Sequence, residues 1–273
     1  MARRKAPRDL PTMLVSAESV SYDRTKFNMH IVKYWRPDGC TSLRVAFLTW
    51  HNETVNIYTH LLPIPFVAML LLRDYGGAVT PLQSRALAAH VIAVLICAAC
   101  SATMHTLESF GNRIFEAALA IDMAGAFIAC VGHALLISYL ELEAAGHLQL
   151  AAGVATSLVV LAVLGGALFA TGTMNSRPKP QSAALMGTPY LVCAASLAVA
   201  GRSRSCWVLC RFTALFALVV VIWVCHLPEA LIGKRATLDR LGNSHNIMHC
   251  GTLLVFYLLN TGYADLLPQG LRF

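Results

Sequence analysis

The sequence predicts an all-α fold, a bundle of seven transmembrane helices preceded by a short cytoplasmic juxtamembrane helix. Three observations lead to this prediction. Of the 273 residues, 57% are hydrophobic and only 13% are charged, and the mean hydropathy is +0.61, which is too apolar for the surface of an ordinary soluble protein. Seven apolar runs have about the length needed to cross a hydrocarbon core of about 30 Å. These runs also lack the period of two residues that strands of a membrane barrel show.

The seven apolar runs are separated by polar or Gly- and Pro-rich connections. The first run is the shortest, and it spans a bilayer only if flanking residues join the helix. No signal peptide is expected, because residues 1–56 are polar and lack an apolar segment before a cleavage site. We expect one transmembrane domain at 43–267, a cytoplasmic tail at 1–42 and a short C-terminal tail at 268–273. The predicted helices cover 57–72, 86–107, 114–140, 148–171, 182–200, 207–227 and 247–267.

The distribution of basic residues predicts how the bundle is oriented. With seven crossings, fifteen of the 21 Lys and Arg residues fall on the N-terminal side of the membrane and six on the other side. Positive residues favour the cytoplasm, so the N-terminus is predicted to be cytoplasmic. We expect a multi-pass protein of the plasma membrane or the Golgi. The net charge of +7 is therefore attributed to this topology and to contact with anionic lipid in the bilayer, not to nucleic-acid binding.

Ionisable side chains in the predicted helices are candidate functional residues. Each costs roughly 2.5 to 3.5 kcal/mol at the centre of a membrane helix, so those that occur need a reason. Ser101 and His105 lie one turn apart near the end of the second predicted helix, and His245 and His249 lie one turn apart where the seventh begins. Asp122 lies about two turns into the third helix. The alternation of crossings places all five at the cytoplasmic end of the bundle.

Three of these residues have the chemistry of zinc ligands. Residues i and i+4 of a helix face the same direction, so His245 and His249 can bind one Zn²⁺ ion while His105 adds a third imidazole from another helix. Three protein ligands leave a fourth position open, which is typical of catalytic zinc sites. We predict two catalytic residues, Asp122 as base or hydrogen-bond partner of the attacking water and Ser101 as an orienting group. In the alternative interpretation, each histidine merely forms a hydrogen bond to a neighbouring helix.

The other histidines are predicted to lie outside this site. His90 precedes His105 by fifteen residues, about 22 Å along a helix, so it belongs at the opposite membrane face. His133 and His226 are expected to form hydrogen bonds between helices. His51 and His60 flank the first helix, where interfacial anchoring is the predicted role.

A short amphipathic helix is predicted just before the first membrane run. Leu43, Phe47 and Trp50 recur at i, i+4 and i+7, as expected for a helix that lies on the cytoplasmic membrane surface. A lid packed over the end of the bundle is the alternative. Glu53 and Asn56 follow at its junction with the first membrane helix, where their polar groups can cap or brace the corner.

Several motifs along the chain resemble those of the progestin and adipoQ receptor family, which is related to haemolysin III proteins. The resemblance covers roughly residues 27–265 and looks strongest for the member-four branch. Glu53 and Asn56 stand at the ExxN positions of this family's entry to the first helix. The motifs are HNETVNIYTH at 51–60, SATMH at 101–105, LAIDM at 119–123, LPE at 227–229, Asp239 and NSHNIMH at 243–249.

This resemblance implies both a fold and a chemistry. It implies a seven-helix bundle with a cytoplasmic N-terminus and a zinc ion held by His105, His245 and His249. It also implies hydrolysis of a lipid amide such as ceramide, with a fatty acid pocket inside the bundle. For the member-four branch the resemblance implies the fold more strongly than it implies the chemistry.

Three functions are compatible with these sequence features. The leading one is a zinc-dependent, ceramidase-like hydrolase or lipid-sensing receptor whose partners are the bilayer and a lipid such as ceramide or a fatty acid. The second is a non-catalytic receptor or scaffold with a structural zinc site, whose cytoplasmic tail and loops recruit signalling partners. An ion transporter ranks third, because transporters distribute ionisable groups across the membrane, whereas this chain gathers them at one end.

Overall fold

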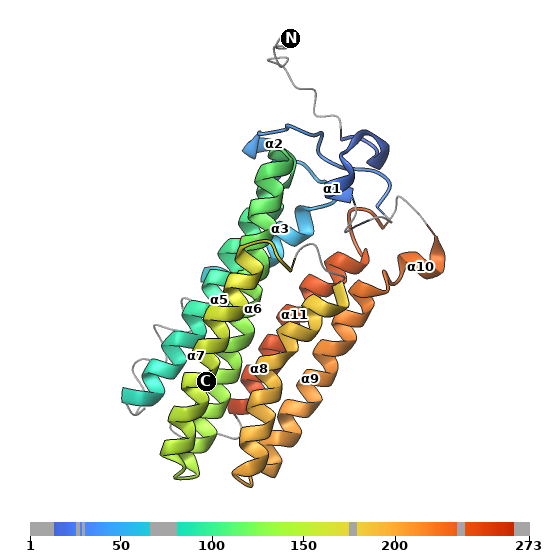
Figure 1. Cartoon of the computed structure of the whole chain (residues 1–273). Helices are drawn as coiled ribbons and strands as arrows, with labels where there is room; N and C mark the ends of the chain where they lie inside the picture. Colours follow the sequence, from blue (N-terminus) through green and yellow to red (C-terminus); the bar gives the residue numbers. More distant parts are fainter. Residues whose placement is uncertain are drawn as a thin grey trace.

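The computed structural model describes residues 14–25, 28, 31–65, 81–174, 179–233 and 238–264. Its long helices run side by side as a bundle (Figure 1). Within the described residues no strand is formed, and Val15 and Trp35 make an isolated bridge. The predicted all-α class is therefore confirmed. The long helices are α5 (Pro81–Leu107), α6 (Asn112–Ala144), α7 (Leu148–Ala170), α8 (Lys179–Val199), α9 (Ser203–Val224) and α11 (Ser244–Ala264).

Five segments in the described part of the chain are long and apolar enough to cross a membrane. They confirm a multi-pass membrane protein and coincide with the second to sixth predicted helices. The predicted seventh helix begins within α11, and the predicted first helix runs past residue 65, so both extend outside the described residues. The count of seven crossings thus stays a prediction. The five segments are Ser84–Phe110, Asn112–Ala144, Leu148–Ala170, Pro180–Val199 and Arg204–Ile232.

Small residues let the helices approach one another closely. Phe127 of α6 is fully buried and lies 5.7 Å from Phe169 of α7, centroid to centroid. A Cβ atom at Gly165 would collide with the Phe127 ring, and one at Gly132 would lie 2.7 Å from the Cβ of Ala93 on α5. Lipid provides no hydrophobic drive for helix association, so such close van der Waals packing contributes to stability instead.

A proline lies inside α8, and the backbone carbonyl that it cannot bind is paired with a side chain. Pro189 has no N–H to donate to the carbonyl of Leu185, one turn earlier. The Thr188 hydroxyl donates to that carbonyl at 2.7 Å. A polar group in a membrane helix is thereby satisfied locally.

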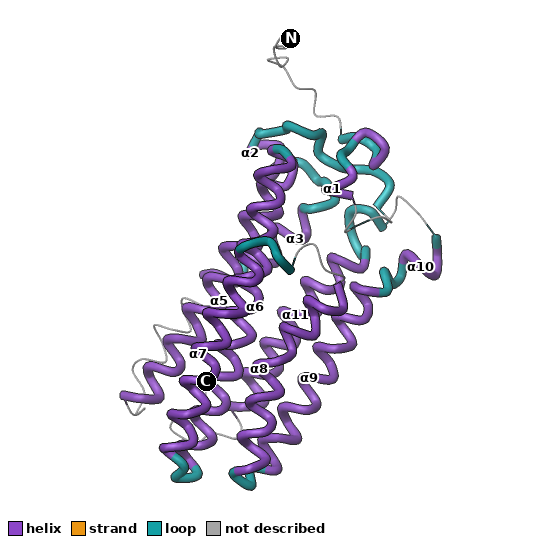
Figure 2. Tube along the Cα trace, in the orientation of Figure 1, coloured by secondary structure: helices purple, strands orange, loops and turns teal. Residues whose placement is uncertain are grey.

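The short elements gather at one end of the bundle, which we call the site end (Figures 1 and 2). They include the predicted juxtamembrane helix, α2 (Leu43–Leu48), whose first turn is capped by the Ser42 hydroxyl accepting from the Val45 N–H at 3.3 Å. Its Leu43 and Leu48 side chains are exposed, and its contact with a membrane surface stays a prediction. The others are η1 (Ala17–Ser19), α1 (Tyr22–Thr25), α3 (Thr54–Leu61), η2 (Glu108–Phe110) and α10 (Glu229–Ile232).

An ion pair ties the helices together near the opposite end. The Arg202 guanidinium, between α8 and α9, donates from Nε and Nη2 to Glu141 Oε2 of α6 at 2.8 and 2.6 Å. The Glu141 side chain is only 2% exposed. A buried carboxylate is tolerated there because the guanidinium neutralises it.

Candidate metal centre

Three histidines meet at the site end of the bundle. His105 is in the last turn of α5, and His245 and His249 are in the first two turns of α11. Their nearest ligand atoms all lie within 4.8 Å of one another. His105 and His249 are buried, at 2% and 5% exposure. The predicted convergence of the three imidazoles is therefore present in the structure.

The start of α11 is fixed by polar groups from the preceding loop. Glu229 Oε1 accepts hydrogen bonds from the Ser244 N–H at 2.8 Å and the Ser244 hydroxyl at 2.9 Å. Asn243 caps the helix, since its Oδ1 accepts from the Asn246 N–H at 2.9 Å. These bonds satisfy N–H groups that a helix start leaves without partners, and they hold His245 at the beginning of its helix.

The partners of two histidines decide which ring nitrogen faces the site. His105 Nδ1 lies 2.7 Å from Glu53 Oε2, and His245 Nδ1 lies 3.0 Å from Asn28 Oδ1. A carboxylate and an amide oxygen can only accept, so both Nδ1 atoms carry the proton. When the two imidazoles are neutral, the Nε2 atoms of His105 and His245 are left with lone pairs, as in metal-binding histidines whose other nitrogen donates to an oxygen.

The third histidine completes a donor set that fits a metal ion. His249 Nε2 lies 3.1 Å from His105 Nε2. Two nitrogens bound to one tetrahedral zinc ion at about 2.0 to 2.1 Å lie roughly 3.3 Å apart. Because His105 Nε2 holds a lone pair, a cation or a proton must lie between the two atoms. The donor chemistry of the three imidazoles and the spacing of this pair suit a divalent metal ion, and coordination by all three would need the His245 ring to turn, because the three ligand atoms spread over 4.8 Å and the His245 and His249 rings are stacked.

The same contacts permit a second arrangement that needs no metal. His60 Nε2 lies 2.6 Å from His249 Nδ1. If His60 Nε2 donates to His249 Nδ1, His249 Nε2 can donate to His105 Nε2. His105 Nδ1 then donates to Glu53, which is the last acceptor in this series of hydrogen bonds. In the metal-binding arrangement the hydrogen bond between these two histidines has the opposite direction, and His249 Nδ1 donates to His60 Nε2. Metal analysis distinguishes the two arrangements.

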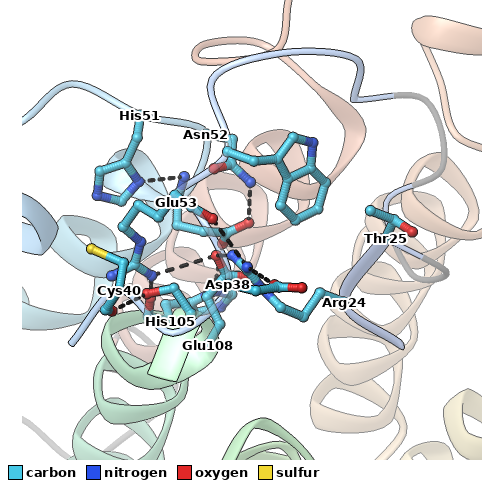
Figure 3. A network of polar contacts seen from close by, with 12 residues as sticks. Arg24, Thr25, Asp38, Cys40, His51, Asn52, Glu53, His105 and Glu108 are labelled. Atoms are coloured by element: carbon cyan, nitrogen blue, oxygen red, sulfur yellow. Dashed lines mark hydrogen bonds and ion pairs between the residues drawn. The ribbon is translucent and has the colours of Figure 1, made fainter. Parts of the chain in front are cut away.

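Glu53 is a buried carboxylate that supports His105 (Figure 3). It accepts hydrogen bonds from Asn52 Nδ2 at 2.8 Å and from Asn56 Nδ2 at 2.7 Å, and Asn246 Nδ2 of α11 donates to Asn56 Oδ1 at 2.8 Å. Burial raises the pKa of the Glu53 carboxyl, but hydrogen bonding and charge interaction with His105 outweigh this effect, so the net pKa is well below its ordinary value. Glu53 is therefore ionised and links α3, α5 and α11.

We expect Glu53→Gln to weaken metal binding about 10- to 100-fold, the usual effect of removing a carboxylate partner of a ligand histidine. The amide keeps the shape of the side chain but removes its negative charge. Competition with a chelator on the purified protein measures the change. Glu141→Gln, which alters a buried carboxylate near the opposite end, serves as the control; an equal loss there would assign the effect to general destabilisation.

The two predicted catalytic residues, Ser101 and Asp122, lie at the same end of the bundle as the histidines. Ser101 is buried one turn before His105, and it forms a hydrogen bond with Asp122 of α6. The Asp122 carboxylate is close enough for its charge to act on His105. The structure thus brings together all five residues that the sequence singled out, and the catalytic roles of Ser101 and Asp122 stay predictions.

The sequence interpretation missed two partners of the site. His60 was expected to anchor at the interface, and that prediction is wrong, because its ring contacts His249. Glu53 was expected to cap or brace a corner: it makes no capping bond, its hydrogen bond with Asn56 braces the corner, and its contact with His105 was not foreseen. Glu53, Asn56 and His60 are spaced i, i+3 and i+7, which places them on one helical face. That spacing was the available signal.

His51, His90 and His133 lie outside the metal-binding group. His90 contacts His133 across α5 and α6, with ring centroids 4.4 Å apart, and both side chains are buried. The separation of His90 from the site is as predicted. His51 is fully buried and lies 2.9 Å from the Ala46 carbonyl oxygen through Nε2, so its predicted anchoring role is wrong.

Acid is expected to destabilise the protein through His51. Burial, together with the positive charge of Arg36, lowers the pKa of His51 from 6.5 to about 4. The unfolded chain therefore binds a proton first as the pH falls. The contribution of neutral His51 to the free energy of unfolding is full above pH 6.5 and disappears by about pH 4, a loss of up to roughly 3 kcal/mol. Thermal unfolding in detergent at pH 7 and pH 4.5 measures it; His51→Gln should show a smaller difference between the two, and an unchanged difference would contradict the assignment.

Comparison with known proteins identifies the family. A family model described as haemolysin-III related matches residues 48–258, a region that contains all three histidines, Ser101 and Asp122. A search of curated proteins returned no significant match. The match covers most of the chain and agrees with the resemblance noted in its motifs, while assignment to the member-four branch stays a prediction. The chain therefore belongs to the haemolysin-III-related family of membrane proteins.

Proposed function

We propose that this protein is a zinc-dependent membrane hydrolase of lipid amides such as ceramide, with His105, His245 and His249 as ligands. The observation that carries the proposal is the convergence of three imidazoles, two of them with Nδ1 donating to oxygen, beside a hydrogen-bonded Ser101 and Asp122. When bound, zinc supplies Lewis acidity, which polarises a carbonyl and activates water at neutral pH. We further propose a cytoplasmic N-terminus, and residence in the plasma membrane or the Golgi.

The roles of the surrounding residues follow from their positions. Asp122 is a carboxylate beside the ligands, and as a general base it accepts a proton from the attacking water and returns it to the leaving amine. Ser101 holds the Asp122 carboxylate through their hydrogen bond. Glu53 fixes the orientation of His105, and His60 fixes that of His249.

An apolar groove lies on the outer face of the bundle. It has a volume of about 320 Å³ and lies between α5 and α6. Its lining includes Arg113 at the start of α6 and the exposed side chains of Ile114 and Ile121, and none of the five candidate residues lines it. Apolar walls suit an acyl chain, and a positive charge suits the polar end of a lipid.

A non-catalytic receptor or scaffold with a structural zinc site is the second candidate. The burial of His105 and His249 favours it, since structural zinc sites are closed whereas catalytic ones keep a position open. In this case the N-terminal segment and the loops would recruit signalling partners.

Metal analysis of the purified protein, combined with a panel of ceramides of different acyl length, tests the proposal. We expect about one zinc ion per chain and release of fatty acid that stops when zinc is chelated and returns when zinc is restored. Zinc-loaded protein that cleaves no ceramide would leave the structural-site candidate, and protein that binds no zinc would exclude both.

A further inference from the structure

A segment before the family match contacts both helices that carry the histidines. It consists of residue 28 and residues 31–40, and we call it the clip. The matched region begins at residue 48, so the clip precedes it. The clip lies at the site end, close to the end of α5 and the start of α11 (Figure 1).

On one side the clip binds the last turn of α5. The guanidinium of Arg36, which is fully buried, donates to the carbonyl of His105 at 2.5 Å and to that of Thr106 at 2.7 Å. Gly39 adds a backbone hydrogen bond from its N–H to the Ser109 carbonyl at 2.8 Å. The last carbonyls of a helix lack partners and carry partial negative charge, so a buried cation is favourable there.

On the other side the clip binds the residues leading into α11. Asn28 accepts from His245 Nδ1 at 3.0 Å. Asp239 Oδ2 accepts from the N–H groups of Val32 at 3.0 Å and Lys33 at 2.7 Å. The guanidinium of Arg240 lies 3.5 Å from the ring centroid of Tyr34, a favourable cation–π contact.

An ionic network that includes Arg24, Asp38 and Glu108 (Figure 3) holds Arg36 in place. Arg24 donates to Glu108 at 2.6 Å, to Asp38 at 2.5 Å and to the Arg36 carbonyl at 3.0 Å. Glu108 lies 3.5 Å from the Arg36 guanidinium as well. Burial lowers the pKa of Arg24, but Glu108 and Asp38 more than offset this effect and raise it overall. Two buried cations are thus balanced by two carboxylates, which limits their desolvation cost.

We propose that the clip is part of the metal centre and sets the position of His105 relative to His245, with Arg36 and Asn28 as positioning residues. The proposal rests on the proposed metal site. The two ligands belong to different helices, and the clip joins them: Arg36 holds the backbone of His105, while Asn28 holds the ring of His245. A metal ion tolerates only small errors in donor position, so a link between the helices preserves its coordination.

The matched variants Asn28→Leu and Asn28→Asp test one anchor. Leucine removes the acceptor for His245 Nδ1, whereas aspartate keeps an acceptor oxygen. Asn28 is only partly buried, so neither change should prevent folding. We expect zinc affinity, measured by chelator competition, to fall about 10- to 100-fold in Asn28→Leu and to be retained in Asn28→Asp. Equal affinities in wild type and Asn28→Leu would overturn the role of Asn28.

Arg36→Lys tests the other anchor, because a single ammonium cannot reproduce the two hydrogen bonds of the guanidinium fork. We expect weaker zinc binding and a changed visible absorption spectrum of the cobalt-substituted protein, which reports ligand geometry. Arg202→Lys alters a guanidinium–carboxylate pair near the opposite end and should leave that spectrum unchanged. A normal cobalt spectrum and normal zinc affinity in Arg36→Lys would overturn the role of Arg36.

The wild-type protein separates failure of this proposal from failure of the metal site. If wild type binds no zinc or cobalt, the metal site itself is wrong, and the clip fails with it. If wild type binds metal and both Asn28→Leu and Arg36→Lys bind it equally well, the clip alone is rejected.

Discussion

His249→Ala is expected to abolish both stoichiometric zinc and ceramide hydrolysis. His249 lies in the middle of the site, with His105 on one side of its ring and His60 on the other. Loss of the imidazole removes one of three protein ligands and leaves His105 Nε2 facing an empty volume. We expect zinc content below about one tenth of wild type and turnover reduced by at least about 100-fold. Elemental analysis and fatty acid release measure the two quantities on the same preparation.

The matched control is His147→Ala, which removes an exposed imidazole before α7, away from the site. It should retain zinc and turnover. Thermal unfolding of both variants shows whether loss of metal in His249→Ala reflects loss of the ligand or loss of the fold. Full hydrolysis by a folded His249→Ala protein would rule out the zinc mechanism.

Asp122→Asn is expected to separate catalysis from metal binding. Asp122 acts on His105 through its charge, and it is not one of the three proposed metal ligands. The amide keeps the size of the side chain and a hydrogen bond to Ser101 but cannot accept a proton. Zinc should therefore remain, while ceramide turnover falls about 10²- to 10⁴-fold, the usual contribution of a general base.

Glu116→Gln provides the comparison on the same helix, because Glu116 is exposed and lies outside the group of five. Its turnover should equal that of wild type. If Asp122→Asn hydrolyses ceramide at the wild-type rate, the assigned base is wrong. If wild type and Asp122→Asn are equally inactive but retain zinc, the site is structural and the scaffold candidate gains support.

Hydropathy and helical spacing were sufficient to predict most of the bundle and the three histidines. The predicted run 148–171 matches α7 to within one residue, because a membrane helix needs a continuous apolar stretch of fixed length. The pair His245 and His249 was predicted because i and i+4 share a helical face. The alternation of seven predicted crossings placed His105 only at the same end of the bundle, and its proximity to the other two histidines comes from the structure.

The contacts around the histidines depend on how helices rotate against one another, which hydropathy does not specify. Glu53 and His105 are separated by 52 positions and His60 and His249 by 189. Nothing in the local sequence of Arg36 indicates that its guanidinium caps α5. These contacts form through tertiary packing, which overrides the local pattern that suggested an interfacial role for His60.

The network of Arg24, Arg36, Asp38 and Glu108 has a consequence for handling the protein. Both guanidinium groups are shielded from solvent, and dissolved ions weaken such interactions much less than those at an exposed surface. Concentrated sodium chloride, which strips loosely adsorbed polypeptides from membranes, should therefore leave the N-terminal segment seated on the bundle. Strong acid, which neutralises the two carboxylates, is the treatment that should release it.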